Sequence, residues 1–250
     1  MKNGFVTLYK GLFIVLAAAM ATIGCNNLES NRASTSETRT ESKTVALGSA
    51  QSVRVSLKMR AGELKVGGGA TPLLDADFTY NVPSWKPEVK YEVSDGVGNL
   101  EVEQPESGGS TGNTRNEWDL HLSNKPPMEM TVNMGAGRAT LTLGGLALSR
   151  LEVNMGAGET TLDLTGNWRK DLSAEIHGGV GKATIRLPKD VGVHVIAQGG
   201  LGSINAGDFH KQGDAYVNDE YGKSPVTLRV EVEGGVGEID LELGGAPPVV

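Results

Sequence analysis

After residue 45, apolar and polar residues alternate along most of the chain, in short runs separated by glycine-containing turns. A period of two is typical of a β-strand that buries one face and exposes the other. The turns lie at residues 60–62, 96–98, 135–137, 156–158, 179–181, 200–202 and 235–237. The second and fourth residues after each turn are apolar, with Thr160 as the exception. The pattern therefore predicts a repeated unit of strand, glycine turn and strand.

The unit repeats regularly in the central part of the chain. Two adjacent copies, VNMGAGRATLTL at 132–143 and VNMGAGETTLDL at 153–164, are nearly identical. Their spacing is too short for a strand–helix–strand crossover but suits one rung of a stacked β-solenoid. We therefore predict an all-β, single-stranded, solenoid-like stack of short strands joined by glycine turns, with Leu141, Leu162 and Ile185 in one column of its core. A β-sandwich, which also has strands at regular spacing, is the alternative.

The first 24 residues have the features of a secretory signal peptide. Lys2 and Lys10 give a positive start, and the apolar run 11–23 is too short to span a bilayer comfortably. The residues that lead to Cys25 resemble the lipobox of bacterial lipoproteins, although Thr22 stands where that pattern usually has leucine. Cys25 is the chain's single cysteine and so has no internal disulfide partner. We expect cleavage after residue 24 and lipidation (palmitate) of Cys25, with ordinary cleavage or a retained anchor as alternatives.

The residues that follow Cys25 indicate which membrane the exported protein reaches. By resemblance to lipoprotein sorting in Gram-negative bacteria, Asn26 in place of aspartate favours the outer membrane. Residues 25–44 are polar and nearly free of apolar side chains, so we expect a flexible tether. Residues 244–250, GGAPPVV, are expected to be a tail that ends the stack, because adjacent prolines cannot extend a strand ladder.

Two parts of the chain resemble the toast-rack family of bacterial envelope proteins. VRVSLKMRAGELKVGGG at 53–69 and LLDADFTYNVPSWKPEVKYEV at 73–93 resemble the domain that commonly precedes the toast-rack domain. VNMGAGRATLTLGGLALSRLEVNMGAGETTLDLTG at 132–166 resembles the toast-rack domain itself, which has relatives in the response to cell-wall-active antibiotics. The resemblance implies an N-terminal β domain at 45–127, a right-handed C-terminal β-solenoid repeat domain at 128–243, and no catalytic residues.

Charge and spacing argue against several kinds of function. A net charge of −7 argues against nucleic acid as a partner. The four histidines have no second ligand at metal-site spacing, and the turn at 234–239 has isoleucine where calcium-binding repeats need aspartate. The acidic residues of the strands fit the exposed positions of the alternating pattern. We therefore predict that the protein is not an enzyme and has no metal site and no cofactor.

A contact patch is the most suggestive local feature. Tyr80 and Trp85 stand among the prolines of the segment after the first repeat, and exposed aromatic residues between prolines often contact a partner. Packing of the same residues against the body of the protein is equally compatible with the sequence.

These features predict a lipid-anchored protein of the cell envelope with a non-catalytic binding or scaffold module. Its partners would be the membrane, through the lipid on Cys25, and an envelope protein or glycan. Envelope maintenance or stress response is the expected setting. The alternative is a structural or adhesion-like protein that self-associates as a homo-oligomer, since the terminal rungs of a stack expose strand edges.

Overall fold

The computed structural model describes residues 33–34, 37–105, 110–111 and 113–244. The predicted signal peptide at 1–24, Cys25, Asn26 and residues 245–250 of the predicted tail lie outside the described residues. Within the described part, the chain has no helix with the length and apolar character needed to cross a membrane.

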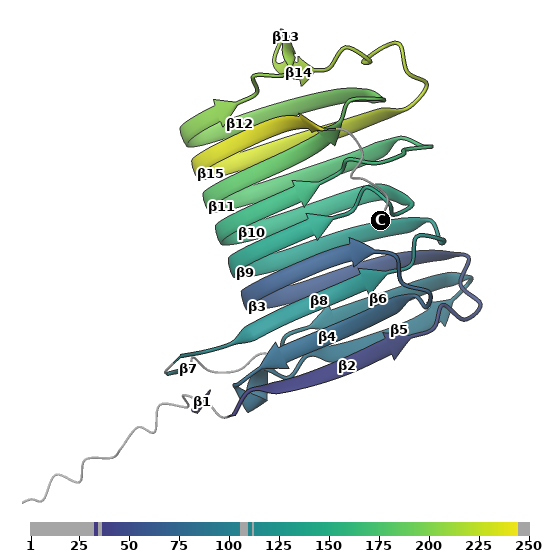
Figure 1. The fold of residues 1–250 in the computed structure, drawn as a ribbon, viewed down its shortest axis with the longest axis vertical. Helices are drawn as coiled ribbons and strands as arrows, with labels where there is room; N and C mark the ends of the chain where they lie inside the picture. Colours follow the sequence, from purple (N-terminus) through teal and green to yellow (C-terminus); the bar gives the residue numbers. More distant parts are fainter. Residues whose placement is uncertain (1–32, 35–36, 106–109, 112, 245–250) are drawn as a thin grey trace, which may run out of the picture. The chain divides into compact units, whose positions relative to one another are not determined.

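Strands make up nearly all of the regular structure in the described residues (Figure 1). The short strands are β1 (Ala33–Ser34), β2 (Arg39–Val45), β4 (Leu74–Tyr80), β5 (Glu88–Ser94), β6 (Val97–Glu103), β7 (Ser110–Thr111), β8 (Asn116–Leu122), β13 (His210–Gln212) and β14 (Ala215–Val217). The long strands are β3 (Ser52–Gly68), β9 (Met128–Thr142), β10 (Leu148–Asp163), β11 (Leu172–Pro188), β12 (Gly192–Asn205) and β15 (Thr227–Gly244). The 3-10 helix η1 (Pro83–Trp85) lies between β4 and β5. The predicted all-β class is confirmed.

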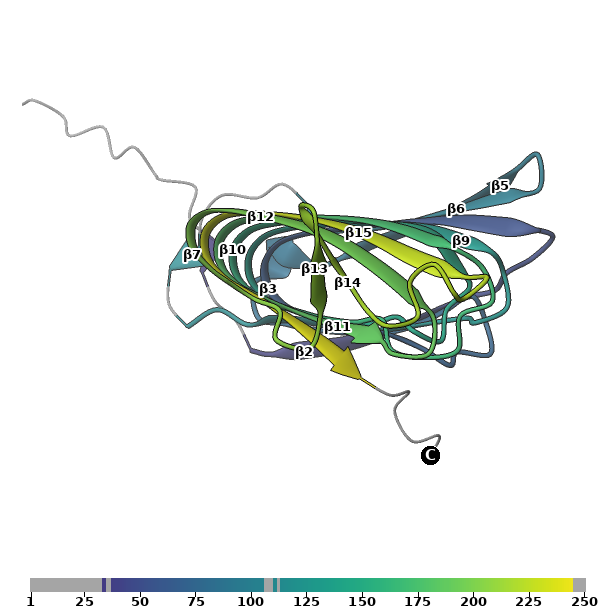
Figure 2. The same cartoon turned by 90° about the horizontal axis from the view of Figure 1, so that it is seen from above.

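Each long strand is one rung, bent at its glycine turn so that its two arms face each other (Figure 2). Neighbouring rungs pair in parallel with turn on turn: Ala61 pairs with Ala136, and Ala157 lies between Ala136 and Val180. The bends therefore join two layers of sheet along one side of the stack, and the loops that return the chain lie on the other side. The predicted solenoid-like stack is confirmed.

The rungs do not stack in chain order. Their order is β3, β9, β10, β11, β15, β12, because β15 pairs with β11 on one side and with β12 on the other. The repeat pattern implied that the turns at 179–181 and 200–202 would be neighbours, which is wrong. Before β15 inserts, the chain forms the hairpin of β13 and β14, and β14 pairs with the first arm of β12 at 194–196.

Complementary charges explain why β15 lies against β11. Lys182 of β11 makes ion pairs with Glu238, at 3.1 Å, and with Asp240. Arg186 pairs with Glu242 at 2.9 Å. β12 carries Ser203 and Asn205 at the positions that match Glu238 and Asp240, and would give β11 no such pairs. Cross-strand charge pairs set which strands and registers are preferred.

The other end of the stack is built from separate strands. Beyond β3, β6 pairs with its first arm and β8 with its second, so no glycine bend joins these two strands. β5 extends the layer of β6, while β4 and β2 extend the layer of β8, all antiparallel. The segment 96–98, predicted as a bend of the stack, instead ends the β5–β6 hairpin turn: Asp95 and Gly96 form the turn at positive φ, and Gly98 lies in β6.

The predicted tether at 25–44 is wrong for residues 39–44, which belong to β2 and pair with β4. β2 is an edge strand with mostly exposed side chains, so its sequence RTESKTV has no apolar alternation to reveal it. Charged residues on an edge strand also discourage pairing with another chain.

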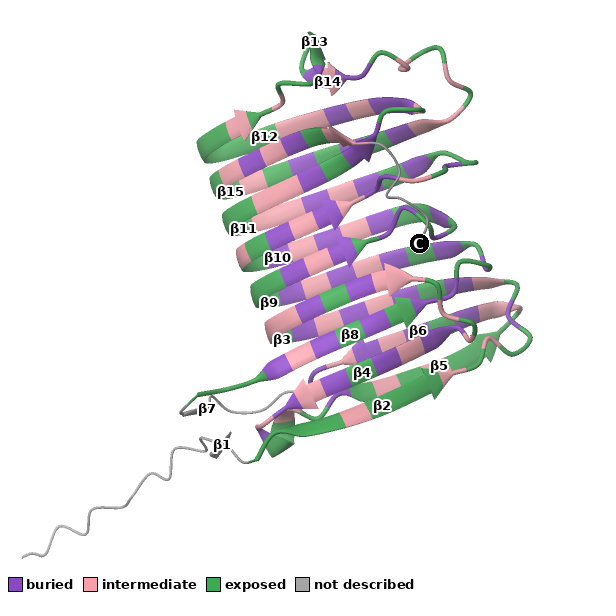
Figure 3. Ribbon diagram, in the orientation of Figure 1, coloured by how far each residue is buried: buried purple, intermediate pink, exposed green. Residues whose placement is uncertain are grey.

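Buried residues recur along the arms of the stacked strands (Figure 3) and together form one hydrophobic core. Inward-facing residues pile up in columns, and the predicted column of Leu141, Leu162 and Ile185 is completely buried and continues to Leu241. Buried and exposed residues alternate along each arm, as the sequence pattern predicts. The core continues from β3 to β9, across the predicted domain boundary at 127/128, and the described residues form one compact unit.

Glycine is required at the last position of each bend. Gly137, Gly158, Gly181, Gly202 and Gly237 have φ between +128° and +152°. A Cβ on Gly158 would also collide with the backbone oxygen of Gly137 on the neighbouring rung. Backbones that approach so closely at positive φ leave no room for a side chain.

Candidate interaction surfaces

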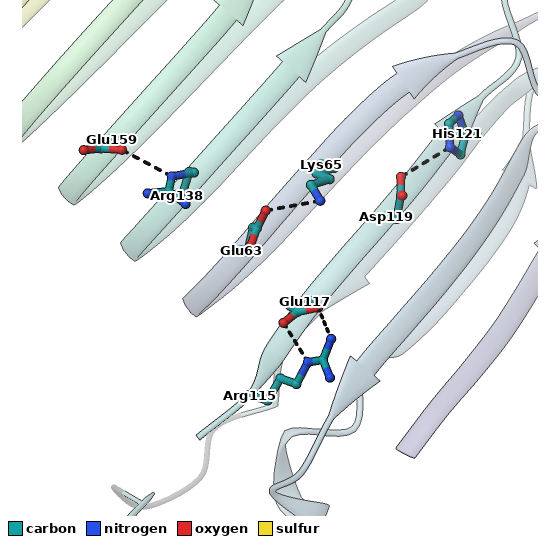
Figure 4. Close-up of polar contacts among 8 residues, drawn as sticks. All are labelled: Glu63, Lys65, Arg115, Glu117, Asp119, His121, Arg138 and Glu159. Carbon is teal, nitrogen blue, oxygen red and sulfur yellow. Dashed lines mark hydrogen bonds and ion pairs between the residues drawn. The ribbon is translucent and has the colours of Figure 1, made fainter. Parts of the chain in front are cut away.

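The outer face of the second layer carries a lattice of charged side chains (Figure 4). Arg138 of β9 pairs with Glu159 of β10 at 3.2 Å. Arg115 makes a two-pronged contact with Glu117, at 2.7 and 2.8 Å, and the hydrogen bonds lower the pKa of the Glu117 carboxyl. Exposed ion pairs of this kind contribute little stability each. The pair of Arg138 and Glu159 joins neighbouring rungs, whereas Arg115 and Glu117 lie two residues apart in the chain.

The sign of the charge alternates along the first column after the bend. Glu63, Arg138, Glu159, Lys182 and Glu238 follow one another on β3, β9, β10, β11 and β15. The column ends at Ser203 on β12, which is neutral. The terminal rung therefore lacks the charge that every other rung carries at this position.

The histidines do not gather into a site. His121 lies near Asp119, His177 near Glu233, and His210 near Asp219, in three exposed pairs on different strands or loops. His194 packs against Tyr221, with ring centroids 5.2 Å apart. Among the residues that the structure describes, no three His, Cys, Asp or Glu side chains are grouped so as to hold a metal ion.

The two residues of the predicted contact patch have different environments. Tyr80 is buried in the core, 1% exposed, and its hydroxyl donates a 2.5 Å hydrogen bond to Glu41. Burial, together with this hydrogen bond, raises the pKa of Tyr80 to about 12. Lys86 donates to the same carboxylate at 2.9 Å and is the main cause of a lowered Glu41 pKa. Trp85 is half-buried in η1, so a contact patch, which stays a prediction, would depend on Trp85.

Buried amide side chains cap the first bend of the stack. The carbonyl oxygen of Gln104 accepts hydrogen bonds from the backbone N–H of Arg60, at 2.9 Å, and of Ala61, at 3.3 Å. Asn116 donates to the backbone oxygen of Ala61 at 2.8 Å, and Trp118 donates to Asn116 at 3.0 Å. β3 has no bent rung beyond it, so these side chains supply the hydrogen bonds that such a rung would provide.

At the opposite end of the stack, the last bend has no comparable cap. β14 pairs with β12 only at 194–196, and Asn218 accepts a hydrogen bond from the backbone N–H of Val193 at 2.9 Å. Residues 197–205 pair with β15 on one side, and on the other side no strand of the described chain pairs with them. This segment, AQGGLGSIN, contains no charged residue.

Apolar side chains form a ridge over the tips of the last three bends. The middle residue of the bend is alanine on β3, β9 and β10, but Val180, Val236 and Leu201 on β11, β15 and β12. These three side chains are 57%, 47% and 73% exposed. Exposed apolar residues in contact with one another, next to a free edge, are typical of an interaction surface.

The inside of the same bends holds a small cavity of about 40 Å³. On the first three rungs, Met59, Met134 and Met155 fill this position, whereas β11, β15 and β12 have glycine there. Thr160 lines the cavity, and its buried hydroxyl has no hydrogen-bond partner in the described chain. The cavity is too small for anything larger than a water molecule or two.

A larger groove lies among the loops on the side of the stack opposite the bends. It has a volume of about 680 Å³, a size typical of ligand sites, and three successive loops line it at 124–127, 144–149 and 165–170. Trp168 forms part of its wall, held by a 2.7 Å hydrogen bond from the indole N–H to the oxygen of Leu164. Lys125, Arg169 and Lys170 line the groove, and none has an ion-pair partner among the described residues.

Sequence reasoning missed both the groove and the free bend. The groove combines loops that the repeat pattern treats as connections. Lys125 and Arg169 stand at the same distance before the last glycine of their bends, but the rung between them has Leu146 there, so the cations form no continuous row in the sequence. The free bend could be found only after the insertion of β15 was known, although the absence of charge from 197–205 was readable in the sequence.

Comparison with known proteins gives the family. Residues 34–186 match the model of the family described as the N-terminal domain of toast_rack, DUF2154. This match includes both segments whose resemblance was noted in the sequence and runs across residue 127, so the predicted domain boundary stays a prediction. No curated protein matches the chain.

Solved structures similar to this chain were also found. A candidate cell adhesion protein from Clostridium sporogenes is 34% identical, with a TM-score of 0.78 over 83% of this chain and 100% of that chain. A candidate adhesin from Bacteroides fragilis is 12% identical over 83% of this chain and 99% of that chain, with a TM-score of 0.37, too low to support an argument. The chain therefore belongs to the toast_rack family.

Proposed function

We propose that this chain is a lipid-anchored cell-envelope protein whose stack is a non-catalytic module for binding an anionic surface glycan. The groove among the loops carries the proposal. It brings together three cations that have no ion-pair partner among the described residues, in a chain of net charge −7.

The lining of the groove favours a sugar as the anionic partner. Beside the cations, the amides of Asn124 and Asn167 and the hydroxyl of Ser149 can exchange hydrogen bonds with sugar hydroxyls. Arg169 can bind a carboxylate or a phosphate with two parallel hydrogen bonds. Apolar groups such as Pro127 and Ala147 complete the surface.

A binding role agrees with the arrangement of the other titratable groups. In the described residues, the carboxylates and cations with shifted pKa values pair with each other on exposed strands, as Glu101 does with Lys58 and Asp240 with Lys182. Such pairs stabilise the sheet surface and are not arranged around a cleft. The 34% identical relative is described as a candidate cell adhesion protein, which supports a place outside the cell.

The experiment for binding is calorimetric titration of the full chain with an oligogalacturonate, which carries one carboxylate per sugar, and with a neutral oligosaccharide of equal length. We expect binding of the acidic sugar alone, weakened at least tenfold by Arg169→Glu. Lys223→Glu, at an exposed position outside the groove, is the matched control and should bind normally. Equal binding of both sugars, or of neither, would refute the glycan proposal, and binding of poly-glutamate instead would point to an acidic protein partner.

The anchor is tested separately, in a Gram-negative host. Mass spectrometry of the exported chain should find Cys25 at the N-terminus with a mass increase for acyl chains, and Cys25→Ser should abolish the increase. Density fractionation should then place the protein with the outer membrane, as Asn26 favours. A mature N-terminus at another residue would refute the lipid anchor and leave the glycan proposal untouched.

Self-association is the second candidate function, favoured by the uncapped bend of β12. Envelope maintenance or stress response is the setting that we propose for either function.

A further inference from the structure

We propose that two copies of this chain pair through the free edge of β12 at residues 197–205, as a symmetric dimer. This inference rests on the second candidate function and specifies its interface. It is independent of the glycan groove, which lies on the opposite side of the stack.

The backbone of 197–205 supplies the hydrogen bonds. A β-strand with a row of unpaired N–H and C=O groups is a template for pairing with another strand. At the β3 end, Gln104 and Asn116 occupy this role with buried side-chain amides. At the β12 end, the backbone side that faces away from β15 has no partner beyond 194–196 in the described chain.

The charges favour β12 over the other edges of the sheets. Proteins commonly protect exposed edges with charged side chains. β2 carries Arg39, Glu41 and Lys43, and β5 carries Glu88, Lys90 and Glu92, so both edges at the far end are protected in this way. In contrast, 197–205 contains no charge, and the alternating column of charges ends on it with Ser203.

The shape of the edge favours a second copy as its occupant. Leu201 is the tip of the bend, and four residues of the free edge lie on each side of it. A two-fold axis through the tips would set the first arm of each β12 beside the second arm of the other, antiparallel. Both free arms would then be paired at once, as in other isologous interfaces. The same axis would align the ridges of the two copies end to end, so that Leu201 of one copy gains an apolar neighbour in Leu201 of the other.

Electrostatics also favours such a dimer over a partner with a charged strand. Each copy carries a net charge of −7, which repels a second copy in general, so association needs a surface free of charge. The bend of β12 is such a surface. An incoming strand with charged side chains would have to lose their hydration without gaining an ion pair from 197–205.

The test is sedimentation equilibrium of the full chain carrying Cys25→Ser, which excludes association through lipid. We expect a concentration-dependent monomer–dimer equilibrium. Ser203→Lys should weaken the dimer at least tenfold and leave the fold intact, because a lysine there continues the alternating charge column beside Glu238. Thr40→Lys, on the protected edge strand β2, is the matched control and should leave the dimer unchanged.

Cross-linking tests the position of the axis. The Cys25→Ser chain has no cysteine, so Leu201→Cys introduces a single thiol at the tip. Mild oxidation should join two Leu201→Cys chains by a disulfide, whereas Val93→Cys on β5, another partly exposed apolar position, should give no such product.

Each result has a distinct meaning. A chain that stays monomeric at all concentrations would refute both self-association and this interface. A dimer that resists Ser203→Lys, or that Thr40→Lys disrupts, would keep self-association but overturn the pairing through β12.

Discussion

Adding one methyl group should have opposite effects at two glycines of neighbouring bends. Gly158 has φ of +132°, and its Cβ would collide with the backbone oxygen of Gly137. Gly178 has no positive φ, and the nearest atom to its Cβ would be the backbone oxygen of Glu233, at 3.9 Å, beside the cavity inside the bends. Gly158→Ala should therefore destabilise the stack, and Gly178→Ala should stabilise it.

The magnitudes follow from the two environments. An alanine held at positive φ is strained by about 1–3 kcal/mol. The collision at Gly158 adds to this strain, because rungs β9 and β10 would have to separate where their backbones pair turn on turn. We expect a total loss of about 3 kcal/mol or more. At Gly178 the alanine reduces the conformational freedom of the unfolded chain and causes no strain in the folded one. It should therefore raise the unfolding free energy by about 0.4–1 kcal/mol.

Urea unfolding followed by circular dichroism measures both changes. Both variants replace a glycine with alanine, so a general effect of this replacement on backbone propensity would change both in the same direction. Such an effect cannot explain opposite results. If Gly158→Ala unfolds within about 0.5 kcal/mol of the parent, the close contact of the bends is not present. A lower unfolding free energy for Gly178→Ala would mean that the space inside the bend of β11 is already filled.

Three further predictions concern polar groups in the core. Thr160→Val removes a buried hydroxyl that has no partner in the described chain, so it should raise the unfolding free energy by about 1 kcal/mol in urea unfolding. A lower unfolding free energy would show that the hydroxyl is hydrogen-bonded. Gln104→Ala should lower it by about 2–3 kcal/mol, because two backbone N–H groups lose their acceptor, whereas the exposed Gln198→Ala at the other end should change it little. The pKa of Tyr80 is about 12 in the folded protein and about 10 in an unfolded chain, so the unfolded state releases its proton first and stability should fall as the pH rises from 10 to 12. Tyr80→Phe should flatten this fall when urea midpoints are compared across that pH range, and equal slopes for the two proteins would contradict the assignment.

The sequence predicted the rungs and their core column because both follow from local alternation. Leu162 lies two residues from its inward neighbours along the chain, and the same pattern recurs in the next copy, so stacking follows from the repeat alone. The position of β15 could not be derived in this way, because alternation gives every rung an inward face. β15 matches β11 better than β12 does, since it offers Leu243 opposite Leu187 and carboxylates to Lys182 and Arg186, but these contacts join residues 56 positions apart, such as Arg186 and Glu242.

Surface sites were harder to predict than the fold. Tyr80 ends the alternating segment LDADFTY, whose inward face the sequence shows but whose place in the sheet depends on pairing at long range with β8 and β2. Gln104 is a polar residue just after a strand, so no apolar pattern marks its burial. The groove needs Lys125 and Arg169 to come together, which they do because every rung returns the chain to the same side of the stack. Alternation fixes which side chains face inward, but it contains no information on which loops meet.

The two ends of the stack together determine what self-association can build. A stack with two free ends could add copies without limit and form a filament. Here the β3 end is closed by the amides of Gln104 and Asn116 and by the charged edges of β2 and β5, which leaves the bend of β12 for pairing. Symmetric pairing would leave neither copy with a free bend, so the assembly stops at two chains.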